Sequence, residues 1–195
     1  MVFQKTKSVE IAVMVMPRTV FSEQDYFNGY HVTVSRCAGP SSSRFALVKS
    51  LDYGKYYNAY QEARAKGFNE TLLVNPKGFI FEASRSNVFF LKDETVYTPS
   101  LTLGCLDGIT RRLVMECARE LKLPAKAIDP KLPDFLRCDE AFLTNTLIGV
   151  MPITQVDGKI IQSGRIGDWT YKIRSQYLKK LAASFKQPLL KPAVV

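Results

Sequence analysis

The sequence has few of the residues that build metal sites and disulfide frameworks. It contains four cysteines and one histidine among 195 residues. The cysteines show no C-x-x-C spacing, so we expect reduced thiols rather than a metal cluster or a set of disulfides. His31 alone excludes any site that needs two imidazoles. We therefore predict that the protein has no metal site.

Long apolar runs are missing as well. No run approaches the ~18 residues that a membrane-spanning helix needs. The opening "MVFQKTKS" lacks the charged start and apolar body of a secretion signal. We expect a cytoplasmic protein that does not contact membranes, and we interpret residues 9–17, "VEIAVMVMP", as a buried strand.

A motif of interleaved basic and aromatic residues is also lacking, although the net charge is +9. The basic residues are spread along the chain, with some density in 165–191. An excess of this size favours an anionic small ligand, such as a phosphate or a carboxylate. Binding to nucleic acid is a weaker alternative, and we expect no nucleic-acid partner.

The sequence does contain hairpins that alternate with helices. We expect strands at 30–36, 71–84 and 87–99, the last two as hairpins turning at "NPKG" and "KDET", and strands again within 139–161. A polar turn is expected at 22–29, and helices at 56–67, 108–124 and 167–185, the last with Asp168 as its cap. On the second helix a shared apolar face is predicted for Ile109, Leu113, Val114, Cys117, Ala118 and Leu121. The fold class is therefore α+β or mixed α/β, without repeats.

Three features carry possible chemistry. Lys49 follows the apolar run "FALV", where desolvation would free its amine to attack a carbonyl, although a lysine at such a position more often snorkels from a strand end. Glu82 stands inside the apolar "FIFEA", either paired structurally or facing a cation from outside the chain. Gly108, Ile109 and Thr110 begin a helix, which is an anion site or an ordinary helix start.

Together these three features match the needs of pyridoxal 5'-phosphate. A lysine amine can form an imine with its aldehyde, and a helix start can bind its phosphate. A buried acid such as Glu82 keeps the pyridine nitrogen protonated. We therefore predict pyridoxal phosphate as the cofactor.

Five segments, in this order, resemble the class IV (fold-type IV) pyridoxal-phosphate enzymes. They are "VKSLDYGKYYNAYQEARAKGFNETLLVN", "GFIFEASRSNVFFLKDETVYTP", "GCLDGITRRLVMECAREL", "DEAFLTNTLIGVMPI" and "VDGKIIQSGRIGDWT". The resemblance implies the large domain of that family, with two packed β-sheets in a pseudo-barrel flanked by helices. It also implies a homodimer.

The resemblance implies roles for several residues. Lys49 matches the Schiff-base lysine, and Glu82 matches the acid on the pyridine nitrogen. Ile109 and Thr110 match the turn that binds the phosphate through backbone N–H groups, and Thr146 matches a second phosphate contact.

Three further positions are weaker matches. Tyr53 matches, after a one-residue gap, the tyrosine that bonds the ring hydroxyl. Arg85 stands where small residues are usual, and we predict that it binds a substrate carboxylate unless it is only a solvated loop residue. Asn145 is a candidate substrate contact.

The form "NTLIGVMP" resembles 4-amino-4-deoxychorismate lyase more than the aminotransferases. We therefore predict a lyase of folate biosynthesis that releases pyruvate and leaves 4-aminobenzoate. The alternative is a branched-chain or D-amino acid aminotransferase acting on a small amino substrate.

The resemblance also implies a small N-terminal α/β domain that this sequence lacks. We expect 1–28 to be a residual strand and connector, 29–185 the cofactor-binding domain and 186–195 an irregular tail. A truncated and catalytically inactive family member is therefore a second alternative.

Overall fold

The structure is a computed structural model that describes residues 13–15, 17, 20–37, 49 and 53–184. Its helical segments are α1 (Glu23–Asn28), α2 (Gly54–Ala65), the 3-10 turn η2 (Leu101–Leu103), α3 (Ile109–Glu120), α4 (Leu132–Phe135) and α5 (Asp168–Ser184). Its strands are β1 (Tyr30–Arg36), β2 (Glu70–Val74), β3 (Ile80–Ala83), β4 (Asn87–Lys92), β5 (Thr95–Pro99), β6 (Ala125–Ile128), β7 (Glu140–Asn145), β8 (Gly149–Val156) and β9 (Lys159–Ile160).

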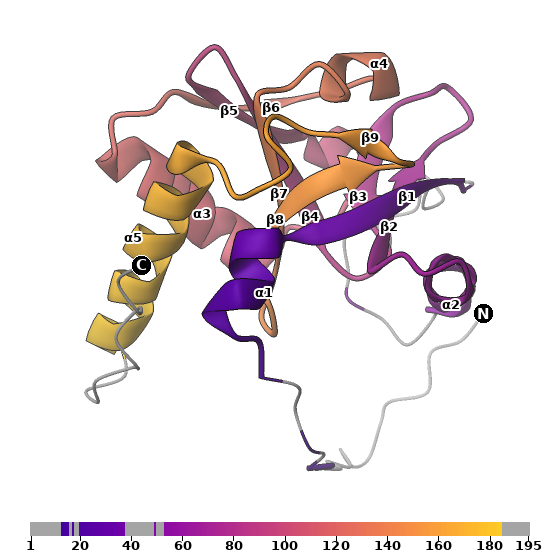
Figure 1. The fold of residues 1–195 in the computed structure, drawn as a ribbon, viewed down its shortest axis with the longest axis horizontal. Helices are drawn as coiled ribbons and strands as arrows, with labels where there is room; N and C mark the ends of the chain where they lie inside the picture. The colour runs from indigo at the N-terminus through magenta and orange to yellow at the C-terminus, as the bar shows by residue number, and fades with distance from the viewer. Residues whose placement is uncertain (1–12, 16, 18–19, 38–48, 50–52, 185–195) are drawn as a thin grey trace, which may run out of the picture.

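The strands form one mixed sheet in the order β3-β2-β1-β8-β7-β4-β5-β6, with β9 added to β8 (Figure 1). The β1–β2, β1–β8 and β5–β6 pairs are parallel, and the other pairs are antiparallel. The sheet curls into a half-barrel, and one isolated bridge joins Phe79, just before β3, to Lys131, which follows β6. The predicted α+β class is confirmed, with the strands of the expected pseudo-barrel joined in a single continuous sheet.

Apolar side chains fill both faces of the curled sheet. One cluster includes Val88, Leu143 and Met151 from the strands and Phe135 from α4. The other lies under α3 and α5, which pack side by side against β7 and β8 (Figure 1). Because alternate residues of a strand point to opposite faces, β4, β7 and β8 contribute to both clusters and are almost fully buried.

The segment predicted as a polar turn at 22–29 is instead helix α1. Ser22 and Asp25 form a capping box, in which each side chain bonds the other's backbone N–H. Glu23 then makes a two-pronged pair with the buried Arg174 of α5, at 2.9 and 2.8 Å. The turn prediction was wrong because it counted polar residues and overlooked the S-x-x-D spacing of a helix start.

Two further predictions need correction. Val13, Met14 and Val15 lie outside any strand with more than four-fifths of each side chain exposed, so this part of 9–17 is no buried strand. The rest of that prediction lies largely outside the described residues. Ile109, placed on the apolar face of α3, is 70% exposed because it stands at the first turn, beyond the sheet. The predicted hairpins, the helix ending near Gly67 and the closing helix are confirmed.

Helix α5 is capped from a distant strand rather than by Asp168. The buried Glu140 of β7 accepts N–H bonds from Trp169 at 3.1 Å and Thr170 at 2.7 Å, and a bond from the Thr170 hydroxyl. A β-carbon at Gly167 would lie 2.0 Å from Cδ of Glu140, so the approach requires glycine. Across the described ranges no helix combines the length and apolar character needed to cross a membrane.

We expect Glu140→Ala to lower the free energy of unfolding by about 3 kcal/mol, because it leaves buried helix N–H groups without an acceptor. Urea denaturation monitored by circular dichroism measures this change. The neighbouring Asp139→Ala, which removes an exposed pair with Lys92 and an exposed bond from the N–H of Asp93, is the control and should cost about 1 kcal/mol. Equal losses in the two variants would contradict the capping role.

Candidate active site

Glu82 lies on β3 with 9% of its surface exposed. Its carboxylate accepts the N–H of Leu106 at 3.2 Å and a hydrogen bond from the Tyr56 hydroxyl. Burial nevertheless raises the pKa of Glu82 to about 7, because these bonds and two nearby lysines only partly offset the lost hydration. Among the residues that the structure describes, the surrounding groups therefore do not fully offset the burial of this carboxylate.

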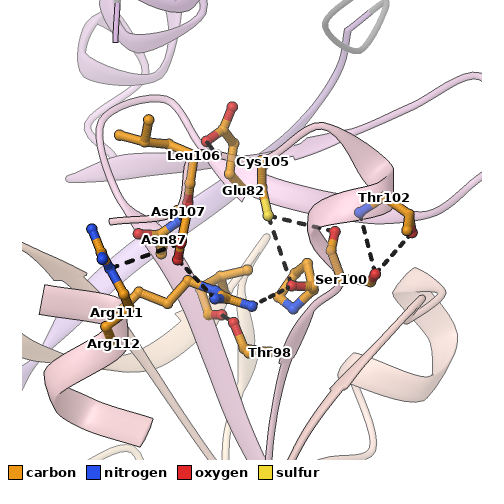
Figure 2. Close-up of polar contacts among 12 residues, drawn as sticks. Glu82, Asn87, Thr98, Ser100, Thr102, Cys105, Leu106, Asp107, Arg111 and Arg112 are labelled. Atoms are coloured by element: carbon orange, nitrogen blue, oxygen red, sulfur yellow. Dashed lines mark hydrogen bonds and ion pairs between the residues drawn. The ribbon is translucent and has the colours of Figure 1, made fainter. Parts of the chain in front are cut away.

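The backbone of the loop before α3 is held against β3 and β4 (Figure 2). Leu106 donates its N–H to Glu82, and its carbonyl accepts the amide of Asn87 at 2.7 Å. A β-carbon at Gly108 would lie 2.3 Å from Oδ1 of Asn87, so only glycine permits this close approach. The start of α3 is therefore fixed to the same strands that carry Glu82.

The N-terminus of α3 has no side-chain cap. Its first N–H groups lie at Ile109 and Thr110, where a helix has no internal acceptors for them and carries partial positive charge. Asp107 would oppose an anion there, but it pairs with Arg111 at 3.2 Å and Arg112 at 3.8 Å (Figure 2). The turn predicted to bind phosphate is therefore available to an anion.

Lys49 is exposed and lies outside any described strand, and the apolar run "FALV" that precedes it lies outside the described residues. Its charge still lowers the pKa of Glu82, which places the two side chains within electrostatic range. Lys55 of α2 acts on Glu82 more strongly, and its amine lies 5.2 Å from the Tyr56 ring centroid. The charges of two lysines therefore act on this acid, of which the sequence indicated only Lys49.

Tyr53 and Tyr56 form a stacked pair at the start of α2, with ring centroids 5.3 Å apart. The Tyr53 hydroxyl donates a short hydrogen bond to the carbonyl of Ser84, and burial raises the pKa of Tyr53 to about 12. Tyr56, which the sequence analysis missed, bonds Glu82, and burial raises the pKa of Tyr56 further still. The pair links α2 to the end of β3.

The turn between β7 and β8 lies beside the loop that follows β3. Thr146 is exposed in this turn. Asn145 donates its amide to the carbonyl of Arg85 at 3.1 Å and to the Ser86 hydroxyl at 3.0 Å, while its oxygen accepts N–H bonds within the turn. In this structure the Asn145 side chain therefore holds the backbone of two loops in place, and Thr146 is exposed beside it.

Glu70 is a second buried acid that the sequence analysis missed. It begins β2, is 1% exposed and pairs with Arg85 at 3.6 Å. The mostly apolar run after it, "TLLV", could have indicated it, just as "FIF" indicated Glu82.

The described residues fit pyridoxal phosphate in three respects. The buried Glu82 lacks a full counter-charge, as a partner of a protonated ring nitrogen would. The start of α3 is uncapped, as a phosphate site requires. Lys49 is exposed and within electrostatic range of the same acid.

The chain resembles known proteins over most of its length. The model of the family "Amino-transferase class IV" matches residues 3–156. A branched-chain-amino-acid aminotransferase of Pseudomonas aeruginosa is 36% identical over 156 residues, 77% of this chain and 46% of that protein. An aminodeoxychorismate lyase of Bacillus subtilis is 33% identical over 112 residues, 57% of this chain and 38% of that protein.

Solved structures show the same similarity. The T.th. branched-chain amino acid aminotransferase with pyridoxamine 5'-phosphate has a TM-score of 0.73 and 27% identity, and the match covers 85% of this chain and 54% of that one. The chain thus spans about half the length of the relatives it matches.

The raised pKa of Glu82 has a consequence for stability. The folded pKa, about 7, exceeds the ordinary 4.5, so the folded protein binds more protons between these values and loses stability as the pH rises through them. Between pH 4.5 and 8 the free energy of unfolding of the unaltered protein should fall by about 3 kcal/mol because of Glu82. We expect this fall to be absent in Glu82→Gln. Urea denaturation across that range compares the two proteins without cofactor, and parallel curves would contradict the assignment.

Proposed function

The chain belongs to the amino-transferase class IV family, and on this premise we propose that it forms the cofactor-binding part of a pyridoxal-phosphate enzyme acting on small amino acids. The observation that carries the proposal is Glu82, a buried acid whose burial is only partly offset by the described residues around it. It lies within electrostatic range of an exposed lysine and is bonded to the loop that leads to an uncapped helix.

Each part of the cofactor has a candidate partner in this chain. Glu82 would pair with the ring nitrogen, and the N–H groups of Ile109 and Thr110 would hold the phosphate, with Thr146 as a second phosphate contact. Lys49 would hold the aldehyde through its Nζ. Tyr53 would stand beside the ring, although its hydroxyl already bonds Ser84 in this structure.

When bound, pyridoxal phosphate supplies an electrophilic aldehyde and an electron-withdrawing pyridine ring. Glu82, once a cation offsets its burial, stays ionised and keeps the ring nitrogen protonated. Nζ of Lys49 can take a proton from the substrate carbon and return it, as general base and acid. The Leu106 and Tyr56 bonds orient the Glu82 carboxylate for this role.

Of the two candidate reactions, amino transfer and the elimination of pyruvate by a lyase, we propose amino transfer as the better supported. The branched-chain aminotransferase relative is more similar to this chain than the aminodeoxychorismate lyase relative, both in identity and in the share of this chain that is matched. The predicted lyase is therefore not specifically favoured. The lyase stays the second candidate because its relative is 33% identical over the matched residues.

The domain division at residue 29, the homodimer and the cytoplasmic location stay predictions. Helix α1, on the N-terminal side of that division, is bonded to the body of the fold through Glu23 and Arg174. We propose that it is part of the same unit.

We expect the purified protein to turn yellow with pyridoxal phosphate and borohydride to fix the cofactor on Lys49. Because Lys55 also acts on Glu82, the matched variants are Lys49→Arg and Lys55→Arg. The label, measured by peptide mass spectrometry, should fall more than tenfold in the first and change less than twofold in the second. Labelling of Lys55 instead, or of neither lysine, would refute the assignment of Lys49.

The two chemistries separate by their need for an amino acceptor. With 4-amino-4-deoxychorismate and no keto acid, a lyase should release pyruvate and 4-aminobenzoate over many turnovers. An aminotransferase should instead turn over an amino acid only when a keto acid is added. Product analysis by liquid chromatography decides between them, and cofactor binding without either reaction would indicate the inactive alternative.

A further inference from the structure

The buried acid Glu70 makes three contacts, two through one carboxylate oxygen and one through the other. Oε1 accepts the N–H of Thr71 at 2.9 Å and a short hydrogen bond from the Ser84 hydroxyl. Oε2 faces Nε of Arg85 at 3.6 Å. One oxygen therefore bonds the ends of β2 and β3, and the other is directed at the arginine.

Arg85 is held on three sides. Its guanidinium carbon lies 3.5 Å from the centroid of the Tyr60 ring, a cation–π geometry, and its Nε faces Glu70. Its backbone carbonyl accepts the amide of Asn145. The side chain is nonetheless 41% exposed, whereas Glu70 is almost fully buried.

This arrangement leaves binding capacity on the arginine. A guanidinium has five N–H donors, and one carboxylate oxygen at 3.6 Å engages only part of them. An arginine already held by stacking and by a buried acid loses little freedom when it binds a second anion. Arg85 is thus an oriented and partly open site for a carboxylate.

The arginine lies close to the proposed cofactor site. Tyr53 bonds the carbonyl of Ser84, next to Arg85, and stacks on Tyr56, which bonds Glu82. The charges of Glu70, Arg85 and Glu82 all act on the pKa of Tyr53. The tyrosine pair therefore connects Glu82 with the segment that carries Arg85.

We propose that Glu70 is a positioning residue that presents Arg85 to the second carboxylate of a dicarboxylic amine substrate, with Tyr60 supporting the guanidinium. This inference rests on the proposed function and deepens it, because it assigns Arg85 and the residues that hold it to the recognition of a second substrate carboxylate at the same site. Glu70 acts only through Arg85, whereas Arg85 contacts the substrate.

The test compares two ligands of five carbons that differ by one carboxylate, glutarate and pentanoate. Isothermal titration calorimetry measures both affinities, with and without pyridoxal phosphate. We expect the protein to bind glutarate at least tenfold more tightly than pentanoate. A ratio near one in the unaltered protein would overturn the proposal.

Three variants separate the roles. Arg85→Ala should bring the ratio close to one, and the exposure of this side chain makes the change compatible with folding. Glu70→Gln keeps an oxygen for Thr71 and Ser84 but turns an amide toward Arg85, so it should lower the ratio at least threefold. Arg137→Ala, which removes the same charge from an exposed pair with Asp134, should leave the ratio unchanged.

Circular dichroism and the urea midpoint confirm that each variant is folded. If Glu70→Gln does not fold, Tyr60→Leu takes its place, because loss of stacking should also lower the ratio. If Arg85→Ala or a folded Glu70→Gln kept the glutarate-to-pentanoate affinity ratio of the unaltered protein, the role proposed for that residue would be overturned. Borohydride labelling of Lys49 in the same proteins distinguishes a failure of this inference from a failure of the proposed function. Labelling of Lys49 without a preference for glutarate contradicts this inference alone. A preference for glutarate without labelling of Lys49 contradicts the proposed function.

Discussion

Glu82 holds a carboxylate where water scarcely reaches it, and the groups around it do not keep it fully ionised at neutral pH. Its Leu106 and Tyr56 bonds orient it, and Lys49 and Lys55 offset part of the burial cost. Such a group is costly for a fold unless a cation joins it. The cost explains why a ligand with a protonated ring nitrogen would be favoured at this position.

Around Glu82, two asparagine side chains hold the backbone of neighbouring loops in place. Asn87 ties the loop before α3 to β4, and Asn145 ties the β7–β8 turn to the loop after β3. Both residues stand at strand ends in one part of the sheet, since Asn87 pairs with Thr144 across β4 and β7. Amide cross-links of this kind keep separate loops in register, which a site assembled from four segments requires.

Several elements were predictable because local rules decide them. The turn sequences "NPKG" and "KDET" sit between apolar runs, and β2–β3 and β4–β5 form there as antiparallel hairpins. The short strand β6, by contrast, reads "AKAI" and carries no clear alternation, so only its parallel pairing with β5 makes it a strand. Helix α4 is a single turn, too short for periodicity to indicate.

By itself the sequence determined the α+β class, the family and the chemical types at Lys49, Glu82 and the start of α3, because residue type and spacing are local properties. The tertiary structure alone decided that Lys55 also acts on Glu82, that Tyr56 bonds it and that Glu70 supports Arg85. Glu70 and Arg85 are fifteen positions apart (85 − 70 = 15) and become neighbours only when β2 pairs with β3. Burial and charge pairing depend on which segments meet in space, and no local pattern encodes that.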